Sequence, residues 1–194
     1  MPSDNFNRVE NPLASGWTTT TGHSALQADG ANCDGTVNSG DHSSYWSAQT
    51  PSGDHWTEIT WRGVAQDSGP CVRNQKTAAT MYNYDAVSDV IAKIVAGAFT
   101  TLQSGPLATW ANNDVGRLEI QGSTIKLKKN GVQVNTNLTD TAIAGGTWAI
   151  FVFSTAAGNA VDNFNGGDFA AGGAFPPVPE AAILKDRLNT LLRM

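Results

Sequence analysis

Residues 117–128, Arg-Leu-Glu-Ile-Gln-Gly-Ser-Thr-Ile-Lys-Leu-Lys, decide the fold class of this chain. Apolar and polar side chains alternate in both halves of the stretch, which is the period of a strand with one buried face. Gln121-Gly122-Ser123, between the halves, predicts a tight turn. Asn130-Gly131 follows, and this dipeptide favours a second hairpin turn into a return strand. The stretch therefore predicts consecutive antiparallel strands.

Short segments on either side of this hairpin also have strand patterns. Residues 55–61, His-Trp-Thr-Glu-Ile-Thr-Trp, are rich in β-branched and aromatic residues. Residues 148–153 are apolar on both faces, which predicts a central strand covered on both sides, and residues 159–164 predict a last strand. Residues 86–98 are apolar enough for a helix, but their Val and Ile residues and Gly97 favour a strand. Many short strands between Gly, Asn, Asp and Ser clusters predict an all-β sandwich or jelly roll.

Composition and charge exclude several classes of protein. The chain has 194 residues, enough for one domain with a core that needs no metal or disulfide. Its net charge of -5 argues against a nucleic-acid partner and against an anionic membrane surface. The apolar window 90–99 is too short to cross a bilayer and carries Lys93. Residues 1–5 lack the basic and apolar runs of a signal peptide, so we expect synthesis in a cytoplasm.

The cysteine pair Cys33 and Cys71 has two interpretations. The first is two independent thiols in the core. The second is a disulfide that joins them, which would indicate a mature protein working outside a reducing cytosol. Neither residue lies in a Cys-x-x-Cys motif or beside a group of histidines, so the sequence does not predict a zinc site.

Motifs at both ends of the sandwich resemble one superfamily. The opening residues 4–8, Asp-Asn-Phe-Asn-Arg, precede Leu13 and Trp17, and the closing residues 161–164 are Val-Asp-Asn-Phe. Together they resemble laminin-G-like jelly-roll domains of the concanavalin A-like lectin and glucanase superfamily, over about residues 3–169. The resemblance implies a two-sheet antiparallel jelly roll. Such domains occur in lectins, glycan-binding appendages, glycosidases and accessory proteins of bacteriophage particles.

The glycosidase branch of that superfamily is not what the sequence favours. Glycosidases need two carboxylates that flank the scissile bond. The glucanase branch carries them as Glu-x-Asp-x-x-Glu on one strand, and that pattern is absent from this chain. Glu58 lies beside Trp56 and Trp61, which would suit a sugar site, but it has no acidic partner at the required spacing. We therefore expect a protein that is not an enzyme and needs no cofactor.

A structural calcium ion is the one metal that the resemblance implies, since related folds often hold one. Asp4, Asp162 and Asp168 would converge if the first and last strands pair. The alternative, which the sequence favours, is that these side chains cap turns. The three histidines lie among polar residues and are expected to be solvated.

Aromatic residues are the only indication of a binding surface, because sugar sites stack exposed rings on pyranose faces. The chain has 6 Trp. We expect core positions for Trp17, Trp61, Trp110 and Trp148, whose neighbours are apolar or β-patterned. The candidate glycan-binding residues are Tyr45, Trp46, Trp56, Tyr82 and Tyr84, although packing in the core is an alternative role for each.

The last part of the chain has a different pattern and predicts an attachment element. A Gly-rich stretch and Pro176-Pro177-Val178-Pro179 form a connector, and residues 180–194 change to helical period. One stripe of this helix carries Leu184, Leu188, Leu191 and Leu192. The sequence thus predicts a sandwich domain over 1–170 and a linker with an amphipathic helix over 171–194. The stripe would bind a second copy in a dimer or trimer, a larger assembly, or its own sandwich.

These observations lead to one main functional hypothesis and one alternative. The main hypothesis is a bacteriophage virion protein that decorates the capsid or belongs to a head or tail fibre. A lectin-like fold with no signal peptide, no catalytic set and an appended helix fits assembly in a host cytoplasm and exposure on the virion surface. The alternative is a free-standing lectin that recognises cell-surface or polysaccharide glycans.

Overall fold

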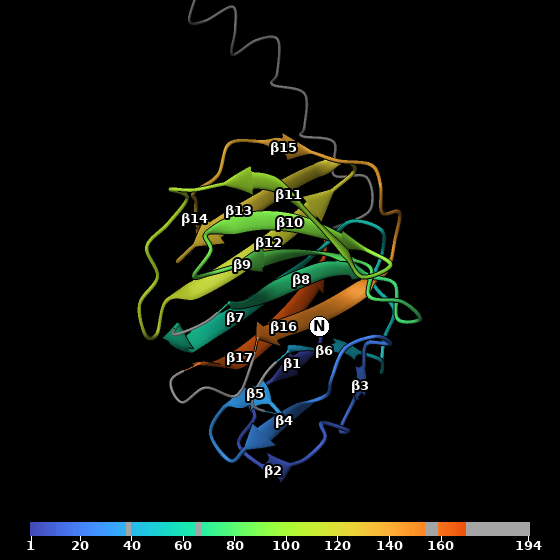
Figure 1. The fold of residues 1–194 in the computed structure, drawn as a ribbon, viewed down its shortest axis with the longest axis vertical. Coiled ribbons are helices and arrows are strands. Elements are labelled where there is room, and N and C mark those ends of the chain that lie inside the picture. Colours follow the sequence, from blue (N-terminus) through green and yellow to red (C-terminus); the bar gives the residue numbers. More distant parts are fainter. Residues whose placement is uncertain (38–39, 65–66, 154–158, 170–194) are drawn as a thin grey trace, which may run out of the picture.

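The computed structural model describes residues 1–37, 40–64, 67–153 and 159–169, and these ranges form two antiparallel β-sheets without a helix (Figure 1). Sheet A runs in the order β14 (Val132–Gln133), β13 (Thr124–Lys129), β12 (Val115–Gln121), β7 (His55–Val64), β17 (Asn159–Asp168), β5 (Cys33–Gly35), β4 (Leu26–Asp29) and β2 (Val9–Glu10). Two short strands extend sheet A, since β1 (Ser3–Asp4) pairs with β17 and β15 (Leu138–Thr139) pairs with β13. Sheet B runs in the order β11 (Ala98–Ser104), β10 (Val90–Val95), β9 (Met81–Asp85), β8 (Ser68–Asn74), β16 (Thr147–Phe153), β6 (Asp41–Trp46) and β3 (Trp17–Thr19).

The predicted all-β fold class is confirmed. The hairpin of residues 117–128 is β12 and β13, with Gln121 opposite Thr124 at the turn. The segment 148–153 lies in β16, a central strand between β8 and β6, and the ambiguous segment 86–98 contains strand β10. The predicted helix over 180–194, with its leucine stripe, lies outside the described residues. In the described ranges, the chain contains no helix long and apolar enough to cross a membrane.

The core lies between the two sheets, where apolar side chains of alternate strand positions meet. Sheet A contributes the inward side chains of β12 and β13, and sheet B those of β9 and β16. Trp17, Trp61, Trp110 and Trp148 are each at most 7% exposed, which confirms their predicted core positions. The ring of Trp61 lies 4.2 Å from that of Trp110, centroid to centroid, and covers one end of the core.

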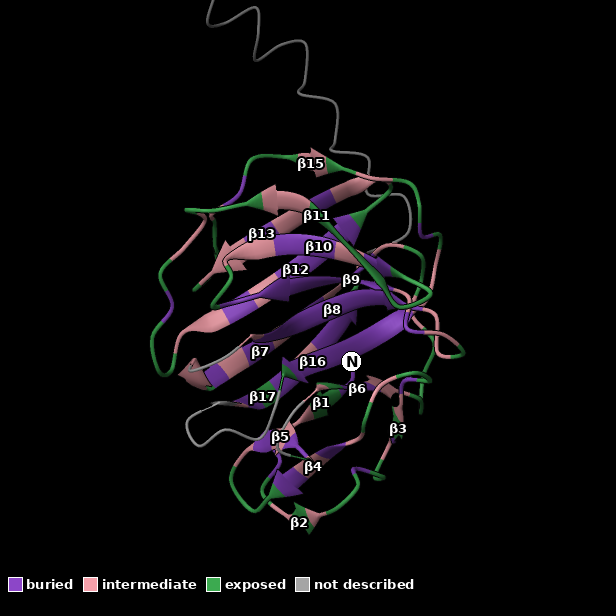
Figure 2. Cartoon of the chain, in the orientation of Figure 1, coloured by how far each residue is buried: buried purple, intermediate pink, exposed green. Residues whose placement is uncertain are grey.

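Sheet B also has buried side chains on its outer face. A second cluster of buried side chains packs there: Cys71, Ala79, Met81, Ile94, Ala149 and Phe151. Figure 2 accordingly shows β8, β9 and β16 buried along most of their length. The outer face of sheet A is different, because it carries ion pairs such as Arg117 with Glu58 at 2.8 Å and Lys128 with Glu119 at 2.7 Å.

Candidate functional site

The outer face of sheet B contains a groove of about 330 Å³, within the size range of small-ligand sites. Its floor comes from the paired strands β9 and β10 and from β16, which β8 separates from β9, and its edges come mainly from loops. The lining residues are Gly22, His23, Asp41, Asp67, Ala79, Asn83, Asp85, Ser88, Ile94, Gly97, Phe99, Phe151 and Phe153.

One wall of the groove is a set of three loops joined by backbone hydrogen bonds. Thr21 N donates to the Lys76 carbonyl at 3.3 Å, and Gly97 N donates to the Ala79 carbonyl at 2.9 Å. Ala96 N donates to Thr80 Oγ1 at 2.8 Å. These bonds join the loop of residues 20–24 to the β8–β9 loop and the β10–β11 turn. Hydrogen bonds between these connecting loops therefore stabilise the wall of the groove.

Two further carboxylates, those of Asp67 and Asp41, line the groove. Asp67 is fully engaged, because its Oδ1 accepts from Val87 N at 3.0 Å and Ser88 N at 2.7 Å, and its Oδ2 accepts from Ser88 Oγ. This carboxylate thus orders the β9–β10 turn and adds negative charge to the groove. The Asp41 side chain is exposed at the start of β6.

The polar groups of the groove floor come from β9, whose side chains alternate between the core and the outer face of sheet B. Tyr82 and Tyr84 point into the core, so Asn83 and Asp85 face outward into the groove. Asn83 Nδ2 donates to Asp85 Oδ1 at 2.6 Å, and both residues are at most 5% exposed. Within the described part of the chain, Asn83 Oδ1 is buried and accepts no hydrogen bond. The floor therefore offers an acceptor that a ligand hydroxyl or amine would satisfy.

The protonation of Asp85 is set by its surroundings. Burial raises its pKa to about 8, and the negative charges of Asp67 and Asp41 act in the same direction. The hydrogen bond from Asn83 opposes this shift only partly. At neutral pH the floor of the groove therefore presents a carboxylic acid that is largely protonated and can donate a hydrogen bond.

Three phenylalanine side chains supply the apolar part of the groove. Phe151 is 5% exposed and lies on the floor, while Phe99 is 52% exposed and Phe153 is 39% exposed. The His23 ring lies 6.1 Å from that of Phe151, and burial lowers the pKa of His23. Apolar rings beside a few convergent polar groups form the combination that sugar-binding sites use.

The five aromatic residues predicted from the sequence do not converge on this groove or on each other. Tyr82 and Tyr84 are fully buried between the sheets, so their prediction as surface residues is wrong. Their hydroxyl groups donate to Asp140 and Asp89 at 2.7 Å. Their phenol rings are therefore unavailable to a sugar.

The three remaining aromatic candidates are partly exposed, in three different settings. Trp46 stacks on Phe164 at the edge of the core, with ring centroids 5.9 Å apart. Trp56 lies on the outer face of sheet A beneath the Arg117 guanidinium, which is 3.9 Å from its ring centroid. Tyr45 shares the outer face of sheet B with the groove but does not line it.

The calcium site that the resemblance implies does not form. Asp4 binds Arg8 Nη1 at 2.7 Å and Trp17 Nε1 at 2.8 Å, Asp162 binds Arg62, and Asp168 accepts from Ser52 N at 2.9 Å. Their carboxylates thus have separate partners along β1 and β17. The described residues contain no group of three His, Cys, Asp or Glu side chains suited to a metal ion.

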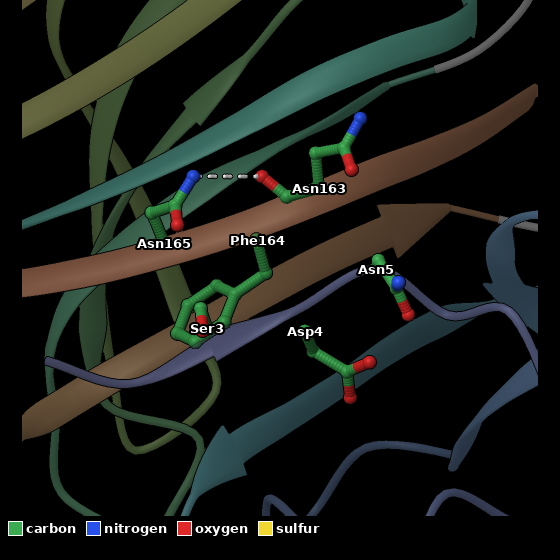
Figure 3. Close-up of a pocket in the computed structure, with 6 residues that line it drawn as sticks. All are labelled: Ser3, Asp4, Asn5, Asn163, Phe164 and Asn165. Atoms are coloured by element: carbon green, nitrogen blue, oxygen red, sulfur yellow. Dashed lines mark hydrogen bonds between the residues drawn. The ribbon is translucent and has the colours of Figure 1, made fainter.

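A second concavity, of about 360 Å³, lies where β1 meets β17 (Figure 3). Its lining residues are Ser3, Asp4, Asn5, Asn163, Phe164 and Asn165. The only aromatic ring among them, that of Phe164, is fully buried. Because this concavity offers a ligand no exposed ring, the groove on sheet B is the stronger candidate.

The disulfide interpretation of Cys33 and Cys71 is also wrong. Both thiols are free and fully buried. Cys33 packs between the sheets from β5, whereas Cys71 packs in the outer cluster of sheet B from β8. Sheet B lies between the two sulfur atoms, so they cannot join without a rearrangement of the fold. The expectation of solvated histidines fails for His42 and His55, which are fully buried.

The groove residues themselves were not predicted from the sequence, although one signal was present. In Met81–Asp85, two tyrosines alternate with Asn83 and Asp85 in a strand too aromatic to lie at the surface. Polar residues on one face of such a strand indicate either a buried network or a site. The other lining residues come from segments far apart in the chain, so no local pattern connects them.

The comparisons with known proteins show the fold and no family. No model of a protein family matches the chain, and no curated protein matches it. Among solved structures, the carbohydrate-binding module CBM66 from Bacillus subtilis superposes with a TM-score of 0.55 at 20% identity, over 77% of this chain and 92% of that one. A Bacillus subtilis protein of unknown function with a galectin-like fold gives 0.53 at 10% identity, over 86% and 98%.

A third solved structure gives a similar superposition. The exoplasmic/lumenal domain of VIP36, solved with Ca²⁺ and Man3GlcNAc bound, gives a TM-score of 0.54 at 8% identity, over 88% of this chain and 91% of that one. These similarities show that the chain has the jelly-roll fold of galectin-like and other carbohydrate-binding domains.

Proposed function

We propose that this protein binds carbohydrate in the groove on the outer face of sheet B. The observation that carries the proposal is the Asn83–Asp85 pair, whose free acceptor lies at the floor of a groove lined by Phe99 and Phe151. A sugar ring presents both an apolar face and hydroxyl groups, so it can pack on the rings and satisfy Asn83 Oδ1. The carbohydrate-binding names among the similar structures support the proposal.

Binding without catalysis fits the groove better than hydrolysis does. A retaining glycosidase needs one carboxylate free to attack the sugar and a second that stays protonated. Asp85 has the raised pKa of an acid, but Asp67 is occupied by two backbone N–H groups and a serine hydroxyl. The name of one similar structure mentions endo-acting O-glycanases, so the test below includes a search for cleaved products.

The experiment is a glycan array with the full chain, followed by titration of the strongest ligand. Phe99→Ala removes an exposed ring from the groove without opening the core, and we expect it to weaken binding about 10-fold. Val132→Ala is the matched control, because Val132 is 68% exposed on sheet A, far from the groove. We expect this control to bind like the unmodified chain, and mass spectra of the ligand to show no cleavage.

Absence of glycan binding would overturn the proposal. So would binding that Phe99→Ala and Asn83→Ala both leave unchanged, because the sugar would then lie elsewhere. A place on a virion surface stays a separate prediction, since it depends on residues 171–194, outside the described part of the chain. Co-purification with phage particles, lost when those residues are deleted, tests it independently of glycan binding.

A further inference from the structure

The charged groups of the groove are almost all of one sign. Asp41 and Asp67 line it beside Asp85, whose carboxyl is largely protonated at neutral pH because its pKa is raised to about 8, and the lining residues include no Lys or Arg. Lys93, from the strand that also supplies Ile94 to the floor, points the other way and binds Asp140 Oδ2 at 2.8 Å. His23 is the only lining side chain that could become cationic, and its burial disfavours the charged form. The groove therefore has negative charge that no neighbouring side chain balances.

An independent observation indicates where a ligand would place a hydrogen-bond donor. Asn83 is fully buried, and its Oδ1 accepts no hydrogen bond from any described residue. A buried acceptor left unsatisfied is costly, so a bound ligand gains from supplying an N–H or O–H there. Asp85, held against Asn83 at 2.6 Å, places a carboxyl group beside the same point. A donor that also carries positive charge would satisfy both groups.

We propose that the preferred ligand is a saccharide with a free, non-acetylated amine, whose ammonium group lies between Asn83 Oδ1 and the carboxyl group of Asp85. This inference rests on the proposed function and adds the class of sugar. The apolar face of the hexosamine ring packs on Phe151 and Phe99, and Asp67 and Asp41 attract the charge from the edge of the groove. Uronic acids and sialylated glycans are disfavoured, because their carboxylates would enter a field of the same sign.

The test compares two sugars that differ only in the substituent on the nitrogen, a free amine in one and an uncharged acetamide in the other. The full chain is titrated at physiological salt and slightly alkaline pH, near the Asp85 pKa of about 8, so that this carboxyl is partly ionised. The ligands are a short β-linked glucosamine oligosaccharide and its fully N-acetylated form. We expect the amine form to bind about 10-fold more tightly, the value of one hydrogen-bonded charge pair. In Asp85→Asn we expect the ratio of the two affinities to fall towards one.

Glu58→Gln is the matched control for overall charge. It removes one negative charge from the chain, but on the outer face of sheet A, where Glu58 pairs with Arg117. We expect it to preserve the preference for the amine. Equal or tighter binding of the acetylated form would overturn the inference. An equal loss of preference in both variants would also overturn it, because general charge attraction would then explain the result.

Failure of the inference and failure of the proposed function are separable. If neither hexosamine oligomer binds but another neutral glycan does, and Phe99→Ala weakens that glycan, the groove binds sugar and the amine preference is wrong. If no glycan of any class binds, the proposed function and the inference are both wrong.

Discussion

Asp85 places an ionisable group that is 5% exposed on the outer face of β9, at the floor of the groove. Its pKa of about 8 in the folded chain exceeds the ordinary value of 3.8 because of burial and of the charges on Asp67 and Asp41. Between these two values the folded state holds a proton that the unfolded state has lost. The contribution of Asp85 to stability is therefore largest below about pH 4 and falls as the pH rises towards 8.

Asp85→Asn tests this linkage at the residue scale. The amide has the same shape and no charge to bury, so the variant should gain stability over the unmodified chain as the pH rises from about 5 to about 9. Urea unfolding at a series of pH values measures the difference. Two stability curves that stay parallel across this range would contradict the assignment of the titration to Asp85.

The two cysteines provide a second prediction at the same scale. Because Cys33 and Cys71 are free and fully buried, the native protein should resist alkylation at both thiols. Burial raises the pKa of each thiol, which suppresses the reactive thiolate further. After unfolding without a reductant, mass spectrometry should find an alkyl group on both. Unfolded chains that take up no alkyl group without a reductant would restore the disulfide.

At the scale of single elements, β12 illustrates how strand packing depends on one small residue. Gly116 lies beneath the ring of Trp61, and a Cβ atom there would come within 2.1 Å of Trp61 Cζ3. That ring is fully buried and packs against Trp110, so it has no room to move aside. The absence of a side chain at Gly116 is what lets the indole lie across the strand.

Gly116→Ala should accordingly destabilise the fold by about 1–3 kcal/mol, the usual cost of overpacking a core. Gly53→Ala is the matched control, because a Cβ atom at Gly53 would meet nothing within 4 Å. The control should keep the stability of the unmodified chain within about 0.5 kcal/mol. Chemical denaturation compares the two variants, and equal stabilities would show that Trp61 can shift to accept the methyl group.

At the scale of the whole molecule, the described strand pairings of both sheets join residues between Ser3 and Asp168. In sheet A the last strand, β17, lies in the interior between β7 and β5. In sheet B the strand β16 lies between β8 and β6. No pairing in either sheet, as described, draws on a residue after Asp168. The predicted boundary between a sandwich over 1–170 and an appended segment stays a prediction.

Deletion of the chain after Gly173 tests that boundary. We expect the shortened protein to be folded, soluble and monomeric, with the β-type circular dichroism and the melting temperature of the full chain. The physical reason is that the deletion removes no strand of the described sheets. Sedimentation of the full and the shortened chain would show whether self-association is lost when the leucine stripe is deleted. Unfolding or aggregation of the shortened chain would mean that the deleted residues belong to the core.

Local sequence patterns were enough to predict the long strands of this protein. Alternation with a period of two is a local property, so the β12–β13 hairpin and the central strand β16 could be predicted from neighbouring residues alone. The same alternation assigns Trp61 to one face of β7 and Trp56 to the other. The alternation separates the two faces of each strand. It does not show which of the two faces will pack against the other sheet.

Which strand faces are covered, and where the groove lies, depends on how the two sheets pack together. Tyr82 and Tyr84 looked like surface residues, yet sheet A packs over their side of β9 and leaves Asn83 and Asp85 outside. The groove collects residues from β6, β9, β10, β11, β16 and five connecting loops. Antiparallel pairing between segments distant in the chain brings them together. Burial, the raised pKa of Asp85 and the unsatisfied acceptor of Asn83 all depend on these long-range contacts, so no stretch of the sequence contains them.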